Sequence, residues 1–249
     1  IYTGTDADNR TITGVGFQPD LAWFKRRNSA TNHGLFDSIR GANKRLSSNL
    51  TDDEFSDSNA LMSFNSDGYV VSSDGTTNAA GTYVSWNWKA GGSAVSNTNG
   101  TITSSVSANP SAGFSIASYT GNNTAGATIG HGLSQAPDWV IIKDRDNDST
   151  QWVHNPRGAL GANYYGYFVT GAFTADSSNV FWYDPTASIV KVSNHAEVNG
   201  ASTNYIMYCF HSVEGYSKVG SFAGNGSETE GPFVHCGFKP AFLLFRRSS

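Results

Sequence analysis

Apolar and polar residues alternate along several short stretches of the chain. The segments "TYVSWNW" (82–88) and "GFSIASYTG" (113–121) place apolar side chains at alternate positions. A period of two sends alternate side chains to opposite faces of a strand. The dipeptides that begin at Asp67 and Asp74 are both Asp-Gly, which favours tight turns around the apolar run between them. Short strands with such turns predict an all-β sandwich, and only residues 51–61 indicate a helical turn.

One phrase is written three times. A Gly-rich turn and a proline (Pro19, Pro137 and Pro240) precede a short apolar run, and the prolines lie 118 and then 103 residues apart. Other landmarks recur in the same order and at similar spacing: 2–4 with 119–121 and 222–224, 40–42 with 157–159, and 82–88 with 204–210. A fixed period of this kind indicates a repeated structural unit.

The apolar run of the phrase predicts a central strand. Residues 21–24, 139–142 and 241–245 are almost entirely apolar, and Lys or Arg follows each run. Such a run is typical of a strand that is covered on both faces. Proline fits at its start because proline has no N–H to donate inside a sheet.

These patterns predict two tandem antiparallel β-sandwich repeats, of jelly-roll or lectin-like type, plus the opening strands of a third. The expected boundaries are 1–92 for the first repeat, 93–113 for a linker rich in Gly, Ser and Asn, 114–216 for the second repeat and 217–249 for the partial third. The chain opens on Ile1 and stops just after the third phrase, so we expect either a window cut from a longer array or a last segment that pairs with the second repeat or with a neighbouring chain.

The composition agrees with this fold and limits the classes of partner that we expect. Charged residues are 14% of the chain and the net charge is −4, which gives no basic footprint for nucleic acid. No apolar stretch reaches the roughly 20 residues that span a bilayer, so we predict no membrane insertion. Cys209 looks buried, and whether it pairs with Cys236 is left open.

The best candidate for a metal site is the acidic run at Asp144, Asp146 and Asp148. The helix-loop-helix calcium pattern requires Gly and Glu at its sixth and twelfth positions, where this chain has Ser149 and Asn155. A looser calcium site in a hairpin loop is the hypothesis that survives, and calcium is the one candidate cofactor. The alternative is a solvated turn between the two strands that flank it.

The candidate ligand site consists of clustered aromatic residues in the second repeat. Tyr164, Tyr165, Trp182 and Tyr183 lie near Asn and Asp residues, as in surfaces that stack on sugars, although a sandwich core uses the same residue types. The six histidines show no metal-binding or acid–base spacing. Asp20 and Asp138 follow their prolines at equivalent positions, which predicts a repeated structural hydrogen bond.

The sequence resembles tandem-repeat proteins of marine bacteriophage virions, especially those of cyanobacterial phages, which are often described as tail fibres. The matching segments are "YTG" at Tyr2 and Tyr119, "TITGVGFQPDLAWFK" from Thr11, "SSDGTTNAAGTYVSWNWKAGG" from Ser72, "NGTITSSVSANPSAGFSIASYTGN" from Asn99 and "VEGYSKVGSFAGNG" from Val213. The second copy departs by inserting "GANYYGYFVTGAF".

The resemblance implies a non-enzymatic structural or adhesive module of a phage virion, located in the virion or outside the cell. Its expected partners are copies of itself or other virion subunits, as a trimer or a filament, and a glycan on the host surface. The alternatives are a lectin-like carbohydrate-binding module and a polysaccharide-degrading enzyme. The last has least support, and it would need two converging carboxylates, which sequence alone neither shows nor excludes.

Overall fold

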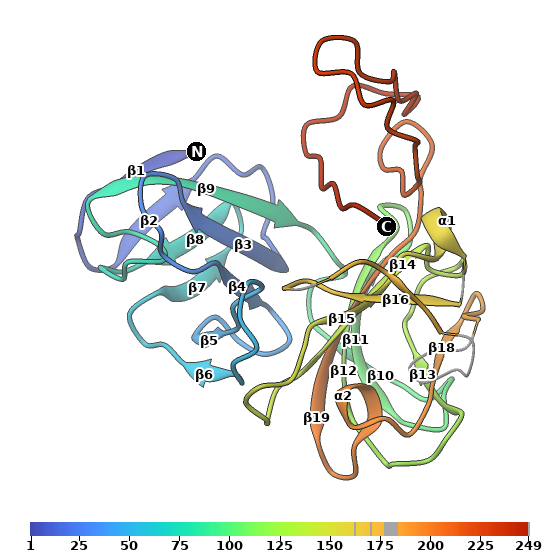
Figure 1. The fold of residues 1–249 in the computed structure, drawn as a ribbon. Coiled ribbons are helices and arrows are strands. Elements are labelled where there is room, and N and C mark those ends of the chain that lie inside the picture. Colours follow the sequence, from blue (N-terminus) through green and yellow to red (C-terminus); the bar gives the residue numbers. More distant parts are fainter. Residues whose placement is uncertain (162, 170, 177–183, 249) are drawn as a thin grey trace.

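The computed structural model describes residues 1–161, 163–169, 171–176 and 184–248. Its regular structure is nearly all strand, arranged in antiparallel sheets, which confirms the all-β prediction. The described helices, α1 (Arg157–Leu160) and α2 (Ala196–Asn199), are single turns. Figure 1 shows two β units side by side, followed by an irregular C-terminal segment. No helix among the described residues is long and apolar enough to cross a membrane.

The first unit is a sandwich of a four-stranded and a three-stranded sheet. The larger sheet has the order β1 (Tyr2–Gly4), β9 (Gly81–Trp88), β3 (Leu21–Arg26), β4 (Gly34–Asp37). The smaller has the order β2 (Arg10–Thr13), β8 (Gly68–Val71), β7 (Leu61–Asn65), and a short ribbon joins β5 (Lys44–Arg45) to β6 (Phe55–Ser56). Phe24, Phe36 and Tyr69 fill the core of this unit.

The second unit contains an eight-stranded sheet and a two-stranded one. The large sheet has the order β10 (Val95–Asn97), β11 (Ser104–Asn109), β12 (Phe114–Thr120), β19 (Asn204–Phe210), β14 (Trp139–Asp144), β15 (Val153–Asn155), β16 (Tyr164–Tyr167), β17 (Thr174–Ala175). The small sheet pairs β13 (Ala127–Gly130) with β18 (Ile189–Val192). Ile129, Ile142 and Met207 lie in the core of this unit.

The two units repeat the same strand pairing. Leu21 of β3 pairs with Trp88 of β9, and Trp139 of β14 pairs with Phe210 of β19. Tyrosine pairs recur too: the ring centroids of Tyr2 and Tyr83 are 5.4 Å apart, and those of Tyr119 and Tyr205 are 5.1 Å apart. The landmarks that recur in the sequence therefore occupy equivalent places in two copies of one sheet.

The repeated phrase forms a strand that is covered on both faces, as predicted. On β3, Ala22 and Phe24 point into the core of the first unit. Leu21 and Trp23 point the other way and pack against residues of the second unit. The apolar run is continuous because each face of the strand is buried against a different layer.

The segment that the sequence predicts as a linker, 93–113, instead belongs to the second unit. It contains β10 and β11, and β11 pairs with β12 over six residues. Ser104 and Ser107 are buried here, and Val106 is the buried apolar side chain of β11. The hairpin needs few apolar residues because β10 is the edge strand and one inward side chain of β11, Val106, joins it to the core, so a composition rich in Ser and Asn concealed it.

Residues 51–61 form no helix, which corrects the prediction of a helical turn there. The segment contains β6, and its acidic residues make ion pairs: Asp57 lies 2.6 Å from Arg45, and Glu54 binds two arginines. Acidic side chains near an apolar run suggested the start of a helix, but here they pair with arginines of the preceding segment and with Arg145 of the second unit.

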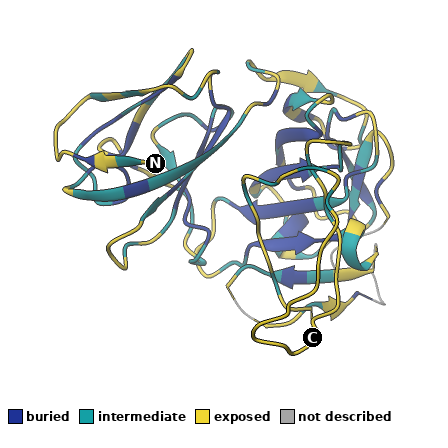
Figure 2. Ribbon diagram, turned by 90° about the horizontal axis from the view of Figure 1, so that it is seen from above, coloured by how far each residue is buried: buried dark blue, intermediate teal, exposed yellow. Residues whose placement is uncertain are grey.

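The third phrase forms no strand, which corrects the expectation of opening strands at 241–245. Among the described residues after Phe210, only an isolated bridge joins Val213 to Ser217. The strands β3 and β14 each lie between two partners, β9 and β4 or β19 and β15, whereas no strand among the described residues pairs with the third phrase. The segment therefore stays exposed, as Figure 2 shows.

Candidate functional site: the interface between the two units

The outward faces of the two large sheets pack against each other. We call the resulting cluster the interface core. Its buried members are Leu21, Leu35, Leu46, Ala90, Phe114, Ile116, Ile141, Trp152, Ile206 and Tyr208, and the partly buried residues around it are Trp23, Ile39, Trp88, Trp139, Phe168 and Phe210. Both units contribute, so the chain has an apolar layer between its two sandwiches in addition to the core inside each.

Aromatic rings carry much of this contact. Trp88 of the first unit lies 6.5 Å from Phe114 and 6.3 Å from Phe210 of the second, measured between ring centroids. Trp23 stacks on Phe168 at 6.5 Å with an interplanar angle of 11°. Aromatic pairs of this kind contribute about 0.5–1.5 kcal/mol each beyond the burial of their area. Several of them across one interface resist separation of the two units.

A small cavity of about 20 Å³ lies within the interface core. Leu21, Trp139 and Phe242 all line it, and these three residues hold the same position in the three copies of the phrase, two residues after the proline. The lining is apolar and aromatic, and such a cavity has room for about one water without partners to hold it. Binding pockets for small molecules are far larger, about 300–1,000 Å³.

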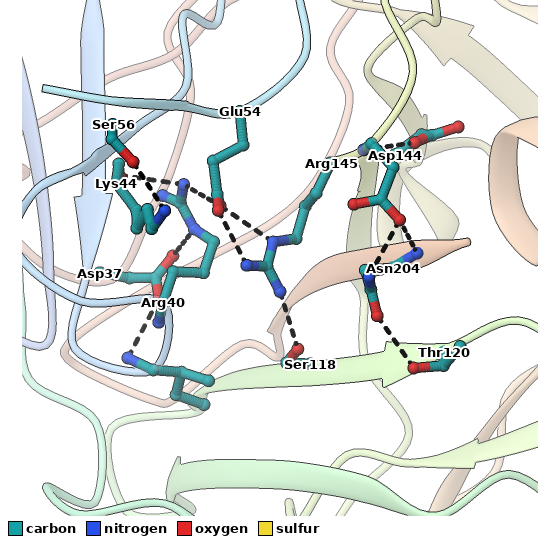
Figure 3. A network of polar contacts seen from close by, with 12 residues as sticks. Asp37, Arg40, Lys44, Glu54, Ser56, Ser118, Thr120, Asp144, Arg145 and Asn204 are labelled. Carbon is teal, nitrogen blue, oxygen red and sulfur yellow. Dashed lines mark hydrogen bonds and ion pairs between the residues drawn. The ribbon is translucent and has the colours of Figure 1, made fainter. Parts of the chain in front are cut away.

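A buried ion network lies beside the aromatic residues and also connects the units (Figure 3). Arg40 Nε lies 2.5 Å from Asp37 Oδ2, and Arg40 Nη1 lies 3.1 Å from Glu54 Oε2. Arg145, from the second unit, donates through Nε and Nη2 to the two oxygens of Glu54, both at 2.9 Å. Tyr208 of β19 donates to Asp37 at 2.7 Å. We call these five residues the ion network.

Ion pairs in the network shift the pKa values of two buried side chains, Arg40 and Glu54, in favour of their charged forms. Burial by itself would lower the pKa of Arg40, but the nearby carboxylates of Asp37 and Glu54 raise it above its ordinary value. Burial also opposes ionisation of Glu54, but hydrogen bonds and charge from Arg145 and Arg40 lower the pKa of its carboxyl. A buried charge keeps its ionised form only with such partners, so the geometry requires both units to be in place.

Further contacts join the loops of one unit to the other. Trp152 Nε1 donates to the carbonyl of Ser47 at 2.9 Å. The buried ammonium of Lys143 donates to the carbonyl of Thr51 at 3.1 Å and to Thr150. Burial lowers the pKa of Lys143 to about 8. Lys25, its equivalent in the first unit, likewise donates to loop carbonyls, so the basic residue after each strand organises a loop.

The predicted calcium residues do not converge on a common point. Asp144 Oδ1 accepts from the backbone N–H groups of Asp146 and Asn147. Asp146 Oδ2 accepts from the backbone and side-chain nitrogens of Asn204. Asp148 is exposed in the same turn, between β14 and β15. Among the described residues no group of three or more His, Cys, Asp or Glu could hold a metal ion.

The structure separates the predicted sugar-contact residues. Tyr164 lies on β16 with 37% of its surface exposed. Tyr165 is half-buried and packs against the core of the second unit. Trp182 and Tyr183 lie outside the described residues. The two that are described therefore do not form a joint stacking surface.

The predicted structural role of Asp20 and Asp138 is confirmed. Asp20 Oδ2 accepts from the backbone N–H of Ala90 at 2.7 Å, and Asp138 Oδ2 accepts from that of Ser212 at 2.7 Å. Ala90 and Ser212 lie at equivalent places, two residues after β9 and β19. Each carboxylate thus fixes the chain where it leaves β9 or β19.

Sequence reasoning did not find the ion network. Arg40 belongs to a recurring landmark, but its equivalent Arg157 is partly exposed and pairs with Asp184 at 2.8 Å. Arg145 lies within the acidic run, whose carboxylates were interpreted as candidate calcium ligands. Cys209 is buried as predicted, and both cysteines are free.

Comparison with known proteins gives a family but no described relative. No curated protein and no solved structure matches the chain significantly. One family model matches residues 1–249, so a single match covers both units and the C-terminal segment. The chain belongs to the family described as a domain of unknown function, DUF7483.

Proposed function

We propose that this chain is a non-enzymatic structural module of a bacteriophage virion, in a tail fibre or another appendage. Its role there is subunit assembly and attachment to the host surface. The observation that supports a mechanical role is the interface core, which together with the ion network joins two sandwiches into one body. The virion setting rests on the resemblance of the repeated segments.

Rigidity is the physical argument for this role. Interfaces between domains of one chain are commonly polar and allow relative motion. Here the outward faces of β3, β9, β14 and β19 share one apolar layer instead. If the units separate, the buried carboxylate of Glu54 loses Arg145, its partner in the second unit, and Asp37 loses the hydrogen bond from Tyr208. A repeat that cannot bend at its joint transmits position and force along an appendage.

The experiment is to locate the protein in particles. Antibodies raised against the chain are applied to virions purified from the native source and detected with gold by electron microscopy, with antibody pre-absorbed on the pure chain as control. We expect label on a fibre or other appendage, together with peptides of the chain in mass spectra of the same particles. Peptides confined to the infected-cell lysate, with unlabelled particles, would contradict the proposal.

A further inference from the structure

The C-terminal segment, residues 218–248, contacts the two units through two anchor residues near its end, Phe242 and Arg246. Within 241–248, Phe242 and Arg246 are partly buried and the other described side chains are exposed. Large apolar side chains of the segment face solvent: Phe233 is 90% exposed and Phe245 is 65% exposed. In the first two copies of the phrase the equivalent strand is largely buried, so this copy has apolar surface that remains uncovered.

The first anchor, Phe242, sits in an aromatic socket on the first unit. Its ring centroid lies 5.5 Å from Trp86 and 5.6 Å from Trp88, edge to face in both cases. Both tryptophans belong to β9, and Phe242 also lines the cavity of the interface core. Phe242 therefore lines the same cavity as Leu21 and Trp139, the residues that hold its position in the other two copies of the phrase.

The second anchor, Arg246, binds the second unit. Its guanidinium donates to the carbonyls of Tyr167 and Gly171 and lies 5.0 Å from the centre of the Phe173 ring. Arg246 is the equivalent of Lys25 and Lys143, which donate to carbonyls of the loop that follows their own strand. Lys143 also donates to the carbonyl of Thr51 in the first unit, and in the third copy Arg246 likewise donates to carbonyls of another unit.

The stretch between the units and the anchors is a loose tether. All residues from Gly220 to His235 are exposed. Hydrogen bonds within the segment include those from Lys218 Nζ to the carbonyl of His235 and from Asn225 Nδ2 to the carbonyl of Glu230. A tether of this length extends by up to about 3.3 Å per residue. The anchors can therefore reach beyond their own molecule.

We propose that the C-terminal segment seats in the socket of a second copy of this chain, where the partner's Trp86 and Trp88 receive Phe242 and the partner's Tyr167 and Gly171 receive Arg246. The partner is thus another copy of the same chain, and the assembly is head to tail, which propagates into filaments if it does not close into a ring. The exchange costs little because the contacts are the same within one chain and between two. This inference rests on the proposed role in subunit assembly and names the contact that performs it.

Cysteine trapping tests the exchange directly. In a Cys236→Ser background, one full-length chain carries Phe242→Cys and a differently tagged one carries Trp86→Cys. The two are mixed at high concentration and oxidised. We expect a disulfide-linked heterodimer, and we expect little of it from the matched mixture in which Leu243→Cys replaces Phe242→Cys, because Leu243 is 54% exposed.

A single chain that carries both Phe242→Cys and Trp86→Cys is the second arm. If this chain closes an internal disulfide while the mixed chains stay monomeric, the seat is correct and the exchange between copies is refuted. If neither forms a disulfide and Phe242→Ala also associates like Leu243→Ala in the measurement below, the socket itself is refuted. Either result is independent of whether virions carry the protein, so it is distinguishable from failure of the proposed function.

Light scattering with size-exclusion chromatography supplies a readout without engineered cysteines. We expect the measured molar mass of the unmodified chain to rise with protein concentration to multiples of 26.6 kDa. Phe242→Ala should shift that association to at least about tenfold higher concentration, whereas Leu243→Ala should leave it in place. Equal association of the two variants would overturn the role of Phe242.

Discussion

At the scale of single residues, the chain buries several of its few charged side chains beside the contact between the two units. Arg40 and Asp37 have fully buried side chains, and Glu54 is nearly so. An unpaired charge in such a place is far more costly than an exposed one, and the pair is held by hydrogen bonds as well as charge. The network therefore makes correct docking of the two units a condition for a stable fold.

Replacing Glu54 by Gln should lower the free energy of unfolding by about 3 kcal/mol, because Arg40 then keeps fewer compensating charges in a buried site. The measurement is urea denaturation followed by far-UV circular dichroism. Asp184→Asn is the control: it breaks the pair with Arg157, but Asp184 is 66% exposed, so the expected loss is below about 1 kcal/mol. Similar losses for the two variants would show that the network is not a buried one.

Two histidines predict how stability depends on pH. Burial lowers the pKa of His154 to about 3, with Arg246 adding to the effect, and lowers that of His131 to about 4. Both stay neutral in the folded chain while the unfolded chain takes up their protons below about 6.5. Each therefore subtracts up to about 1.4 kcal/mol of stability per pH unit as pH falls from about 6.5 toward its folded pKa.

The check is the pH dependence of the free energy of unfolding for His154→Asn, whose side-chain oxygen can still accept from Trp139 Nε1. We expect a shallower loss of stability between about pH 6 and 4 than in the unmodified chain. His235→Asn, at an exposed position, should leave the slope unchanged. An unchanged slope in His154→Asn would mean that His154 is protonated in the folded chain.

At the scale of elements, the β10–β11 hairpin decides whether residues 93–113 are a linker or part of a sandwich. Val95 and Val106 face each other as a cross-strand pair, but Val95 is 66% exposed while Val106 is 3% exposed. Only Val106 reaches the core of the second unit. The hairpin therefore covers an edge of the large sheet that would otherwise be open.

Val106→Ala should destabilise the chain by about 2 kcal/mol, since it removes buried methyl groups and leaves a small cavity. Val95→Ala, on the opposite strand, should change stability by less than about 0.5 kcal/mol because the side chain is already in water. Thermal denaturation of the two variants side by side measures the difference. Equal and small losses of stability in the two variants would indicate that the hairpin is a linker and not part of the sandwich.

What the sequence could predict follows from how local each signal is. The period of two and the repeated phrase identified β3, β9, β12, β14 and β19, because each of these strands shows its burial in its own residues. β10 and β11 were not recognised because this hairpin at the edge of the sheet buries a single valine, Val106, and its serines resemble a linker. The ion network escaped for another reason: Glu54 and Arg145 lie 91 residues apart, and nothing local in either segment indicates the other.

At the scale of the whole molecule, the chain consists of three apolar layers: a core in each unit and the interface core between them. The third layer is made by the same positions of the phrase in each copy, with Leu21 and Trp139 meeting at one cavity. The outward face of each unit thus supplies an apolar surface on which the other unit packs. A repeat built in this way specifies its own neighbour.

The interface core predicts that the two units unfold together. In the unmodified chain, tryptophan fluorescence and far-UV circular dichroism should report a single coincident transition in urea. Trp88→Ala removes the ring that contacts Phe114 and Phe210 across the interface, so the transitions of the two units should separate. Val71→Ala is the matched control: Val71 lies in the core of the first unit, so it should lower the midpoint and leave one transition. If Trp88→Ala also keeps a single transition, the units are coupled through the ion network and the strand connection rather than through the aromatic layer.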